Sequence, residues 1–537
     1  MIRELVIKNF KGILNADIKF NKDRNVIVGN NGVGKSTIME ALSLVLGYGL
    51  NQLEIVPSLF NIQSALQFVD DKIPPEIIIE VYFNDDDTTT HAEFSGKNNT
   101  KHEYACGIQL KISFDSDIYD DLYEAEIAEN PQIPCEYYKI ERNWFSDNPV
   151  IQRQIPYYAM VIDSSSNYFQ SSSNQYIVNL LQRYVGDKET IKIKSGLRRL
   201  KQSFEQDGDL RSINEDIARK RRELSLSIDV SSNIITRNII CPYFNHIPVS
   251  QIGAGDLCIL KTLLSLDKTH LTDKPKIVII EEPESHLSHT KMYELINGLN
   301  DSINGQDTQV IITTHNNFIA NKLNLDKLLL ITNEQGNIKV TGFSGYEYLT
   351  SFFTKVSNYP TLRLILSNAA ILVEGPADEM VVTYYYQKRY KCHPFEHGIE
   401  LISVDGVKFK AFVELAIITQ KKVAVITDND YMESIDEILT ERGLDELPDF
   451  IKVFTDANPN NHTLEPSFVN ANVDNLQELS DTIRKRHHES DNESDLVKYM
   501  IGHKTDWAFR LLKKIDEVDF NVPTYIVDAV RWIDGRD

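Results

Sequence analysis

The sequence predicts an α/β protein with two regions, each containing parallel β-strands. The first region is indicated by a glycine-rich loop near residue 30, which lies between an apolar run and a helical pattern. The second is indicated by apolar runs separated by helical stretches after residue 350. Since domains usually have roughly 100–200 residues, a chain of 537 residues has room for two or three of them.

The composition is that of a globular protein, with 42% hydrophobic and 25% charged residues. No apolar run reaches the roughly 20 residues of a membrane helix, and the charged opening MIRELVIKNFKG is unlike a signal peptide. We therefore expect a soluble, cytoplasmic protein with no membrane partner. Five scattered cysteines without a C-x-x-C pair argue against a zinc ribbon or a disulfide framework.

The net charge of −22 by itself disfavours a nucleic-acid partner. Basic clusters nevertheless occur around residues 192–201, 219–222 and 484–486. Each of these clusters is more simply explained as a solvated helix face. Local charge rather than net charge decides contact, so a nucleic-acid partner stays open.

A phosphate-binding loop is predicted in VIVGNNGVGKS, residues 26–36, which fits G-x-x-x-x-G-K-S after a short apolar strand. Backbone N–H groups of such a loop face the β-phosphate at a helix N-terminus. Lys35 can reach the β/γ oxygens, and Ser36 can ligate Mg²⁺. We therefore expect ATP with Mg²⁺ here. The expected contacts from the loop are Gly29, Asn30, Asn31, Gly32, Gly34, Lys35, Ser36 and Thr37.

The acidic partner of this loop is predicted in KIVIIEEPESHL, residues 276–287. Residues 277–280 form an apolar run typical of a buried parallel strand. Glu281 and Glu282 follow at its carboxyl end, where ligands bind in such sheets. Glu281 would hold Mg²⁺ through water, and Glu282 would orient or activate the attacking water.

Two further stretches flank this acidic strand. The run QVIITTHNN ends near His315, which could contact the γ-phosphate. The stretch SQIGAGDLCIL places Gly253 and Gly255 before an apolar helix, where their N–H groups would make a second anion site.

This order of phosphate loop, glycine signature, acidic strand and histidine resembles an ABC-type ATPase head of the SMC/RecF kind. The resemblance implies that the signature loop of one head binds the ATP held by another, so that a dimer closes on nucleotide. The chain departs from the pattern in having Gly253 for the usual serine and Glu281 for the usual aspartate. The Q-loop glutamine of such heads has three candidates here: Gln52, Gln63 and Gln67.

The stretch between the phosphate loop and the acidic strand lacks sustained heptads, so no long coiled-coil arm is expected. Residues 76–115 alternate like strands, 164–174 read as a loop, and 175–228 read as helices of mixed charge. We expect a short helical insertion at 161–235 that serves in dimerisation; a helical lid without a partner is the alternative. The ATPase domain would comprise 1–160 and 236–350, and a second domain 365–537.

In the second region, three apolar runs end in acids. Glu374 and Asp378 follow the first run, Asp405 the second, and Asp428 with Asp430 the third. Because carboxyl ends of parallel strands share one edge of a sheet, these acids are expected to converge. Crowded carboxylates raise each other's pKa unless a cation relieves them. Mg²⁺ or Mn²⁺ fits an all-oxygen set.

This E-G and D-x-D pattern resembles a Toprim domain. Two later stretches offer Glu465 in NHTLEPSF and Lys504 in IGHKTDWAF, although each alone is more simply a surface residue. A cation there could stabilise charge on a scissile phosphate. With the ATPase head in front, residues 1–345 and 365–537 resemble the OLD (overcoming lysogenisation defect) family nucleases. The resemblance implies the metal ligands Glu374, Asp378, Asp428, Asp430 and Glu465, with Lys504 assisting; Asp405 matches less securely.

The resemblance implies an ABC-type P-loop ATPase domain with a helical insertion, followed by a Toprim α/β domain. The implied function is an ATP-binding, metal-dependent DNA endonuclease whose nucleotide state gates two-metal hydrolysis, as in bacterial anti-phage defence. The implied partners are DNA, further copies in a homodimer or tetramer, and either a helicase-like protein, as in the Gabija system, or a retron reverse transcriptase with its DNA–RNA product.

Two other functions are weighed against this one. A non-cleaving RecF-like DNA-binding or repair protein would have a degenerate acidic site, whereas five acids are intact here. Strand passage or primer synthesis would need a DNA-gate domain with a tyrosine nucleophile, or a zinc module. The sequence leaves open whether ATP activates or restrains cleavage, and whether one or both DNA strands are cut.

Overall fold

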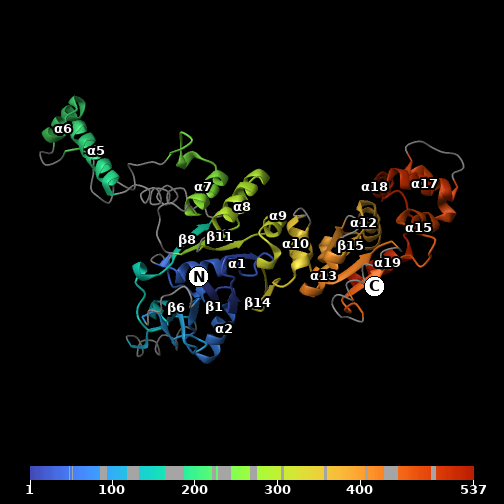
Figure 1. The fold of residues 1–537 in the computed structure, drawn as a ribbon, viewed down its shortest axis with the longest axis horizontal. Helices are drawn as coiled ribbons and strands as arrows, with labels where there is room; N and C mark the ends of the chain where they lie inside the picture. The colour runs from blue at the N-terminus through green and yellow to red at the C-terminus, as the bar shows by residue number, and fades with distance from the viewer. Residues whose placement is uncertain are drawn as a thin grey trace. The chain divides into compact units, whose positions relative to one another are not determined.

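The chain forms two compact units, one of Met1–His315 with Ile331–Val340 and one of Asn316–Leu330 with Thr341–Asp537 (Figure 1). The second unit thus includes residues 316–330 and 341–350, which the sequence analysis assigned to the ATPase domain. The computed structural model describes residues 1–47, 49–50, 53–84, 93–117, 132–163, 187–220, 225–227, 243–266, 275–303, 308–355, 360–404, 409–428, 439, 446–484 and 492–536.

The N-terminal unit is built on one mixed sheet, which has 12 strands among the described residues. Its antiparallel part contains β1 (Ile2–Phe10), β2 (Ile13–Lys19), β4 (Ile77–Phe83), β5 (Ser95–Gly96), β6 (Ala105–Phe114) and β7 (Tyr138–Trp144). Its parallel part runs in the order β3 (Arg24–Val28), β12 (Thr308–Thr313), β11 (Lys276–Glu281) and β8 (Tyr158–Asp163). Strands β13 (Leu328–Glu334) and β14 (Asn337–Gly342) lie between the two parts.

The burial patterns explain this division. Every residue of β3 and of β12 is buried, as expected for parallel strands covered on both faces. Strand β2 instead alternates buried and exposed side chains along ADIK, which is the pattern of a sheet with one wet face. The phosphate loop follows the carboxyl end of β3, and the acidic pair lies at the carboxyl end of β11. Both therefore lie at the same edge of the parallel part of the sheet.

Helices complete the N-terminal unit. Helix α1 (Lys35–Val45) packs against β4 and β6, and α8 (His289–Ile303) packs against β12 and α7 (Ala254–Leu266). Helix α2 (Ile62–Asp71) begins at Asn61, whose side chain caps it. Two more helices, α5 (Asp187–Glu205) and α6 (Gly208–Lys220), lie in the region expected to be a helical insertion. The predicted loop at 164–174 lies outside the described residues.

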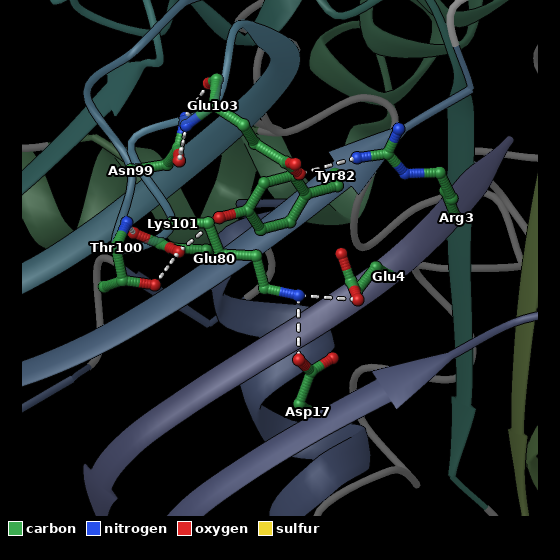
Figure 2. Close-up of polar contacts among 9 residues, drawn as sticks. All are labelled: Arg3, Glu4, Asp17, Glu80, Tyr82, Asn99, Thr100, Lys101 and Glu103. Carbon is green, nitrogen blue, oxygen red and sulfur yellow. Dashed lines mark hydrogen bonds and ion pairs between the residues drawn. The ribbon is translucent and has the colours of Figure 1, made fainter.

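A polar network joins the antiparallel strands (Figure 2). Glu80 is fully buried, and its carboxylate accepts hydrogen bonds from Tyr82 (2.9 Å), from the backbone and hydroxyl of Thr100 (both 2.8 Å) and from Gln109 (2.8 Å). Lys101 lies between Glu4 and Asp17 and is 2.7 Å from each of them. The network fixes the segment around residue 100 on the sheet.

The C-terminal unit has a four-stranded parallel sheet in the order β16 (Ile399–Ser403), β15 (Ala369–Val373), β17 (Lys422–Ile426) and β18 (Ile451–Phe454). Val373 pairs with Ser403 and Ile426, and Ile426 pairs with Phe454, so the four strands end level with one another. The main helices are α9 (Asn317–Lys322), α10 (Glu347–Lys355), α11 (Thr361–Leu366), α12 (Pro376–Tyr390), α13 (Phe409–Thr419), α15 (Leu464–Asn470), α16 (Leu476–Ile483), α17 (Glu493–His503), α18 (Thr505–Lys513) and α19 (Thr524–Asp534).

The cysteines are free thiols wherever the structure describes them. Cys106, Cys135 and Cys258 are buried and Cys392 is partly buried, while Cys241 lies outside the described residues. Within the described residues, no helix combines the length and the apolar character needed to cross a bilayer.

Candidate functional sites

The loop between β3 and α1 has the conformation that its glycines allow. A Cβ atom on Gly29 would lie 2.6 Å from the carbonyl oxygen of Ile331, which no side chain tolerates. Gly32 (φ 78°) and Gly34 (φ 107°) adopt the left-handed region that favours glycine. Helix α1 starts directly after Gly34, so its first N–H groups point into the loop. The predicted phosphate cradle is thus folded in the chain as it stands.

Lys35 lies against this loop. It is only 6% exposed, and its Nζ donates to the carbonyl oxygens of Gly29 (2.9 Å) and Asn30 (3.0 Å). Burial lowers the pKa of Lys35, while the charges of Glu282 and Glu281 oppose this. The acids after β11 are therefore near enough to act on the lysine, as the sequence predicts for a nucleotide site.

Glu282 and His315 face one another at this edge. The backbone of Glu282 is left-handed (φ 39°), and its N–H donates to the carbonyl oxygen of Thr313 (3.1 Å), which holds the ends of β11 and β12 together. The Nε2 of His315 lies 3.1 Å from a carboxylate oxygen of Glu282. A base and a histidine placed together in this way suit a water-activating pair.

Glu284 is a residue that the sequence analysis did not single out. Its Oε1 accepts hydrogen bonds from the hydroxyl of Thr314 (2.7 Å) and from the backbone N–H of His315 (2.6 Å). Glu284 therefore fixes the backbone that carries the histidine. The only hint in the sequence was that Glu284 is the third acid of EEPE, which follows one predicted strand, while TTH follows the next.

The signature glycines before α7 have different surroundings. A Cβ on Gly255 would lie 2.4 Å from the carbonyl oxygen of His286, so this glycine allows α7 to pack closely on the turn after β11. A Cβ on Gly253 would meet nothing within 4 Å. Close packing therefore explains the glycine at position 255. Gly253 instead has open space beside its Cα atom, which leaves its backbone accessible to a ligand.

The Q-loop glutamine stays unassigned. The side chain of Gln63 donates to the carbonyl oxygen of Gln335 (2.9 Å), and Gln67 donates to Asp71 (3.1 Å). Gln52 lies outside the described residues.

In the C-terminal unit, a cavity of about 440 Å³ opens at the carboxyl ends of the strands. Glu374 comes directly after β15, and Asp428 follows the end of β17 by two residues, while Asp378 and Glu465 lie in the first turns of α12 and α15. All four carboxylates line this cavity together with Lys504, which lies between α17 and α18. Asp405 and Asp430 lie outside the described residues.

The carboxylates of this cavity are crowded. Burial, followed by the charge of Glu374, raises the pKa of Asp378 to about 7, although the N–H of Gly375 donates to its carboxylate (3.1 Å). Burial and a neighbouring like charge both disfavour the ionised carboxylate, and a bound cation would offset them. An all-oxygen set fits Mg²⁺ or Mn²⁺. Among the described residues, no three acidic, histidine or cysteine side chains lie close enough to share one ion.

A second layer lies beneath these acids and was not predicted. Asp456, after β18, accepts hydrogen bonds from the N–H of Asn458 and the side chain of Asn461, both 2.8 Å long. Burial opposes ionisation, but hydrogen bonds with Ser467, Asn458 and Asn461 hold the pKa of Asp456 below its usual value. Ser467 also bonds to buried Tyr525, whose pKa is raised by burial and by Asp378, Asp428 and Asp456.

This layer fixes the segment that carries Glu465. Asn461 precedes Glu465 and Ser467 follows it, so Asp456 holds the chain on both sides of that acid. Thr463 donates its hydroxyl to Glu465 (2.7 Å). The only sequence signal was that Asp456 follows a fourth short apolar run.

Comparisons with known proteins agree with this arrangement. Residues 1–320 match the family model of the AAA ATPase domain, and residues 365–430 match that of the "Overcoming lysogenization defect protein-like, TOPRIM domain". The chain belongs to the AAA ATPase domain family, and it carries a segment that matches an OLD-like Toprim domain.

Among its relatives are three curated proteins. The chain is 23% identical to Endonuclease GajA of Bacillus cereus over 323 residues, which is 52% of this chain but only 44% of that protein. It is 24% identical to an ATP/GTP phosphatase of Helicobacter pylori, covering 59% of this chain and 85% of the relative. It is also 24% identical to the OLD nuclease of Thermus scotoductus, covering 78% and 79%.

In this OLD-like chain, the Toprim match includes Glu374, Asp378, Asp428 and Asp430 but ends before Glu465 and Lys504. The structure brings these last two residues to the same cavity.

Proposed function

We propose that the chain is an ATP-regulated, metal-dependent DNA endonuclease that acts at the cavity of the C-terminal unit. One observation carries this proposal: four carboxylates and Lys504 surround a single cavity, where the pKa of Asp378 is raised to about 7. Acids gathered in this way favour cations, and cations bridge acids to a phosphodiester. The names of the GajA endonuclease and the OLD nuclease, both relatives of the chain, support this substrate class.

Each residue at the cavity has a proposed role. Glu374, Asp378, Asp428 and Glu465, completed by Asp430, would hold Mg²⁺ or Mn²⁺. Bound metal supplies an activated water and stabilises the leaving oxygen. Lys504 would place its ammonium group against the scissile phosphate. Thr463 orients Glu465 through its hydroxyl group, and the apolar side chain of Ile501 also lines the cavity.

The N-terminal unit would bind ATP and gate this chemistry. The loop residues 29–37 would bind the phosphates, with Ser36 and Glu281 on Mg²⁺ and with Glu282 and His315 at the γ-phosphate. The signature around Gly253 would act on the nucleotide of a second copy. The resemblance to OLD nucleases suggests that this gated nuclease acts in anti-phage defence in the cytoplasm of a bacterium. Its partner would be a helicase-like protein or a retron reverse transcriptase.

A homodimer or tetramer would form through the ATPase heads and the helical insertion. Helix α5 supports this idea, because Ile193, Leu200 and Phe204 are 39%, 58% and 41% exposed and recur at spacings of seven and four residues. Such a stripe is typical of a helix that pairs with a partner.

The proposal is tested with supercoiled plasmid, the full-length chain and Mg²⁺ or Mn²⁺, with and without ATP. Wild-type protein should nick or linearise the plasmid, whereas the variant with Asp428→Ala and Asp430→Ala should not. Asp474→Ala, which removes an exposed acid of the same unit, serves as the matched control. Lys35→Ala should alter the response to ATP while leaving metal-dependent cutting in place.

Unchanged cutting by the double variant would refute the site. If wild-type protein shifted DNA in the presence of ATP without cutting it in either metal, the non-cleaving RecF-like function would replace this one.

A further inference from the structure

The cavity of the C-terminal unit continues into a strip of lysines and exposed apolar side chains on α17 and α18. Ile501, Lys504 and Thr505 line the cavity. On a helix, residues three or four positions apart are neighbours on one face. Lys498 therefore lies next to Ile501 on α17, and Phe509 lies next to Thr505 on α18, with Lys513 one turn further. We call Lys498, Ile501, Lys504, Phe509 and Lys513 the α17–α18 strip.

The strip is open to solvent. Ile501 is 51% exposed and Phe509 is 56% exposed, although both are large apolar side chains. Trp507 and Leu511, on the other face of α18, are fully buried, so the core does not need Phe509. Exposed apolar groups beside a candidate active site indicate a surface that binds a ligand.

The charge of the strip is opposite to that of the chain. The chain carries a net charge of −22, yet Lys498, Lys504 and Lys513 are exposed and form no ion pair or hydrogen bond within the described part of it. The nearest acid on α18, Asp506, is already paired with Arg510 (3.5 Å). Three lysines that form no ion pair among the described residues, with an aromatic ring near them, match the chemistry of a strand of nucleic acid, in which phosphates alternate with flat bases.

We propose that the α17–α18 strip binds one unpaired DNA strand that leads into the cavity, with a base stacked on Phe509. This inference rests on the proposed function and narrows its substrate. A base inside a duplex already has both faces stacked, so Phe509 can receive a base only from a single strand, a frayed end or a flap. Lys498 and Lys513 contact phosphates on either side of the cavity entrance.

Binding without cleavage tests the stacking. The full-length chain is titrated in EDTA against a fluorescent 20-nucleotide single strand and against a blunt hairpin duplex, with anisotropy as the readout. Phe509→Ala should weaken binding of the single strand by about 5- to 100-fold and binding of the duplex less than about twofold. Phe509→Trp should retain wild-type affinity. The matched control is Phe395→Ala, since Phe395 is 64% exposed and does not line the cavity.

The lysines are tested by the salt dependence of the same binding. A phosphate contact in a single strand contributes about 0.7 to the slope of log K against log salt. Lys498→Gln and Lys513→Gln should each lower the slope by about this amount. An unchanged slope in both variants, equal losses on single strand and duplex, or wild-type strand binding by Phe509→Ala would each overturn the inference.

The outcome is separable from that of the proposed nuclease. Asp428→Ala should abolish cutting and keep strand binding. If the wild type binds the strand through Phe509 but never cuts, the nuclease proposal fails and the strip stands. If it cuts while Phe509→Ala binds normally, only the strip fails.

Discussion

Glu80 in the N-terminal unit and Asp378 in the C-terminal unit are both sheltered carboxylates, but their surroundings differ. Glu80 is fully buried and receives hydrogen bonds from Tyr82 and Thr100 (Figure 2) and a further one from Gln109, four in all. Asp378 accepts a hydrogen bond from the N–H of Gly375, and Glu374 and Glu465 act on it as like charges. One acid is surrounded by donors, whereas the other is buried with the charges of two acids acting on it.

This difference separates a structural acid from the acids that we propose bind a cation. A carboxylate that finds its donors within the protein stabilises the fold. A carboxylate among other carboxylates instead stores repulsion, which a cation relieves. The comparison predicts that changes at the first site act on stability and that changes at the second act on activity.

The largest effect is expected for Glu80→Ala. The change leaves the hydroxyl of fully buried Tyr82 without its acceptor, at about 1–3 kcal/mol for such a group, and it removes the acceptor of half-buried Thr100 and Gln109 as well. The free energy of unfolding of the N-terminal unit should fall by roughly 3–5 kcal/mol. Urea denaturation followed by circular dichroism measures it. Metal-dependent cutting at low temperature should persist in the folded fraction, and a loss of cutting without a loss of stability would break the comparison.

Glu374→Gln should have the opposite profile. The variant keeps the shape of the side chain but removes a charge that favours the cation and disfavours ionised Asp378. Plasmid cutting in Mg²⁺ should fall by about 100-fold or more, since losing a partner of the ligands alone costs about 10- to 100-fold. The melting temperature of the metal-free chain should stay the same or rise. If the variant lost stability and kept its activity, Glu374 would be a structural acid like Glu80.

The sequence predicted the second kind of acid better than the first. Glu374 and Asp428 were predictable because strand ends in a parallel sheet meet at one edge, so an apolar run followed by an acid carries positional information. Glu80 gave no such signal, because its donors come from β4, from β6 and from a loop 20 residues away. The phosphate loop was equally predictable from the sequence, since its glycines are required by local backbone angles that other residues rarely adopt.

A third prediction concerns the pH dependence of the metal-free chain. Asp378 has a folded pKa of about 7, well above the roughly 3.9 of an unfolded aspartate. Between these values the folded state binds more protons than the unfolded state, so stability falls as pH rises from about 4 to about 7. Thermal melts in EDTA across this window should show the loss for the C-terminal unit, and Asp378→Asn should flatten it. A melting temperature that instead rises with pH in the wild type would contradict the raised pKa of Asp378.

Residues that position other residues were beyond the reach of the sequence. Glu284 and Asp456 act through backbone groups and amides on neighbouring segments, and their place after an apolar run does not show which groups they hold. Their roles appear only once the chain brings TTH beside EEPE, and Asn461 and Ser467 to either side of Glu465. Such contacts form between segments that are distant in the sequence, and they leave no periodic pattern or motif in a single sequence.

The smallest effect is expected for Asp456, which has donors like Glu80 but lies beside the proposed metal ligands. Asp456→Ala frees Asn461 and Ser467 and so loosens the segment that presents Glu465. The Mg²⁺ concentration for half-maximal cutting should rise about 10-fold, with the rate at saturating metal close to wild type. Asp456→Asn, which keeps an acceptor oxygen, should recover part of the loss, and Asp474→Ala should show none. A general loss of stability would lower the folded fraction at every metal concentration, so a fall in the saturating rate with an unchanged metal midpoint would assign Asp456 to the same structural class as Glu80.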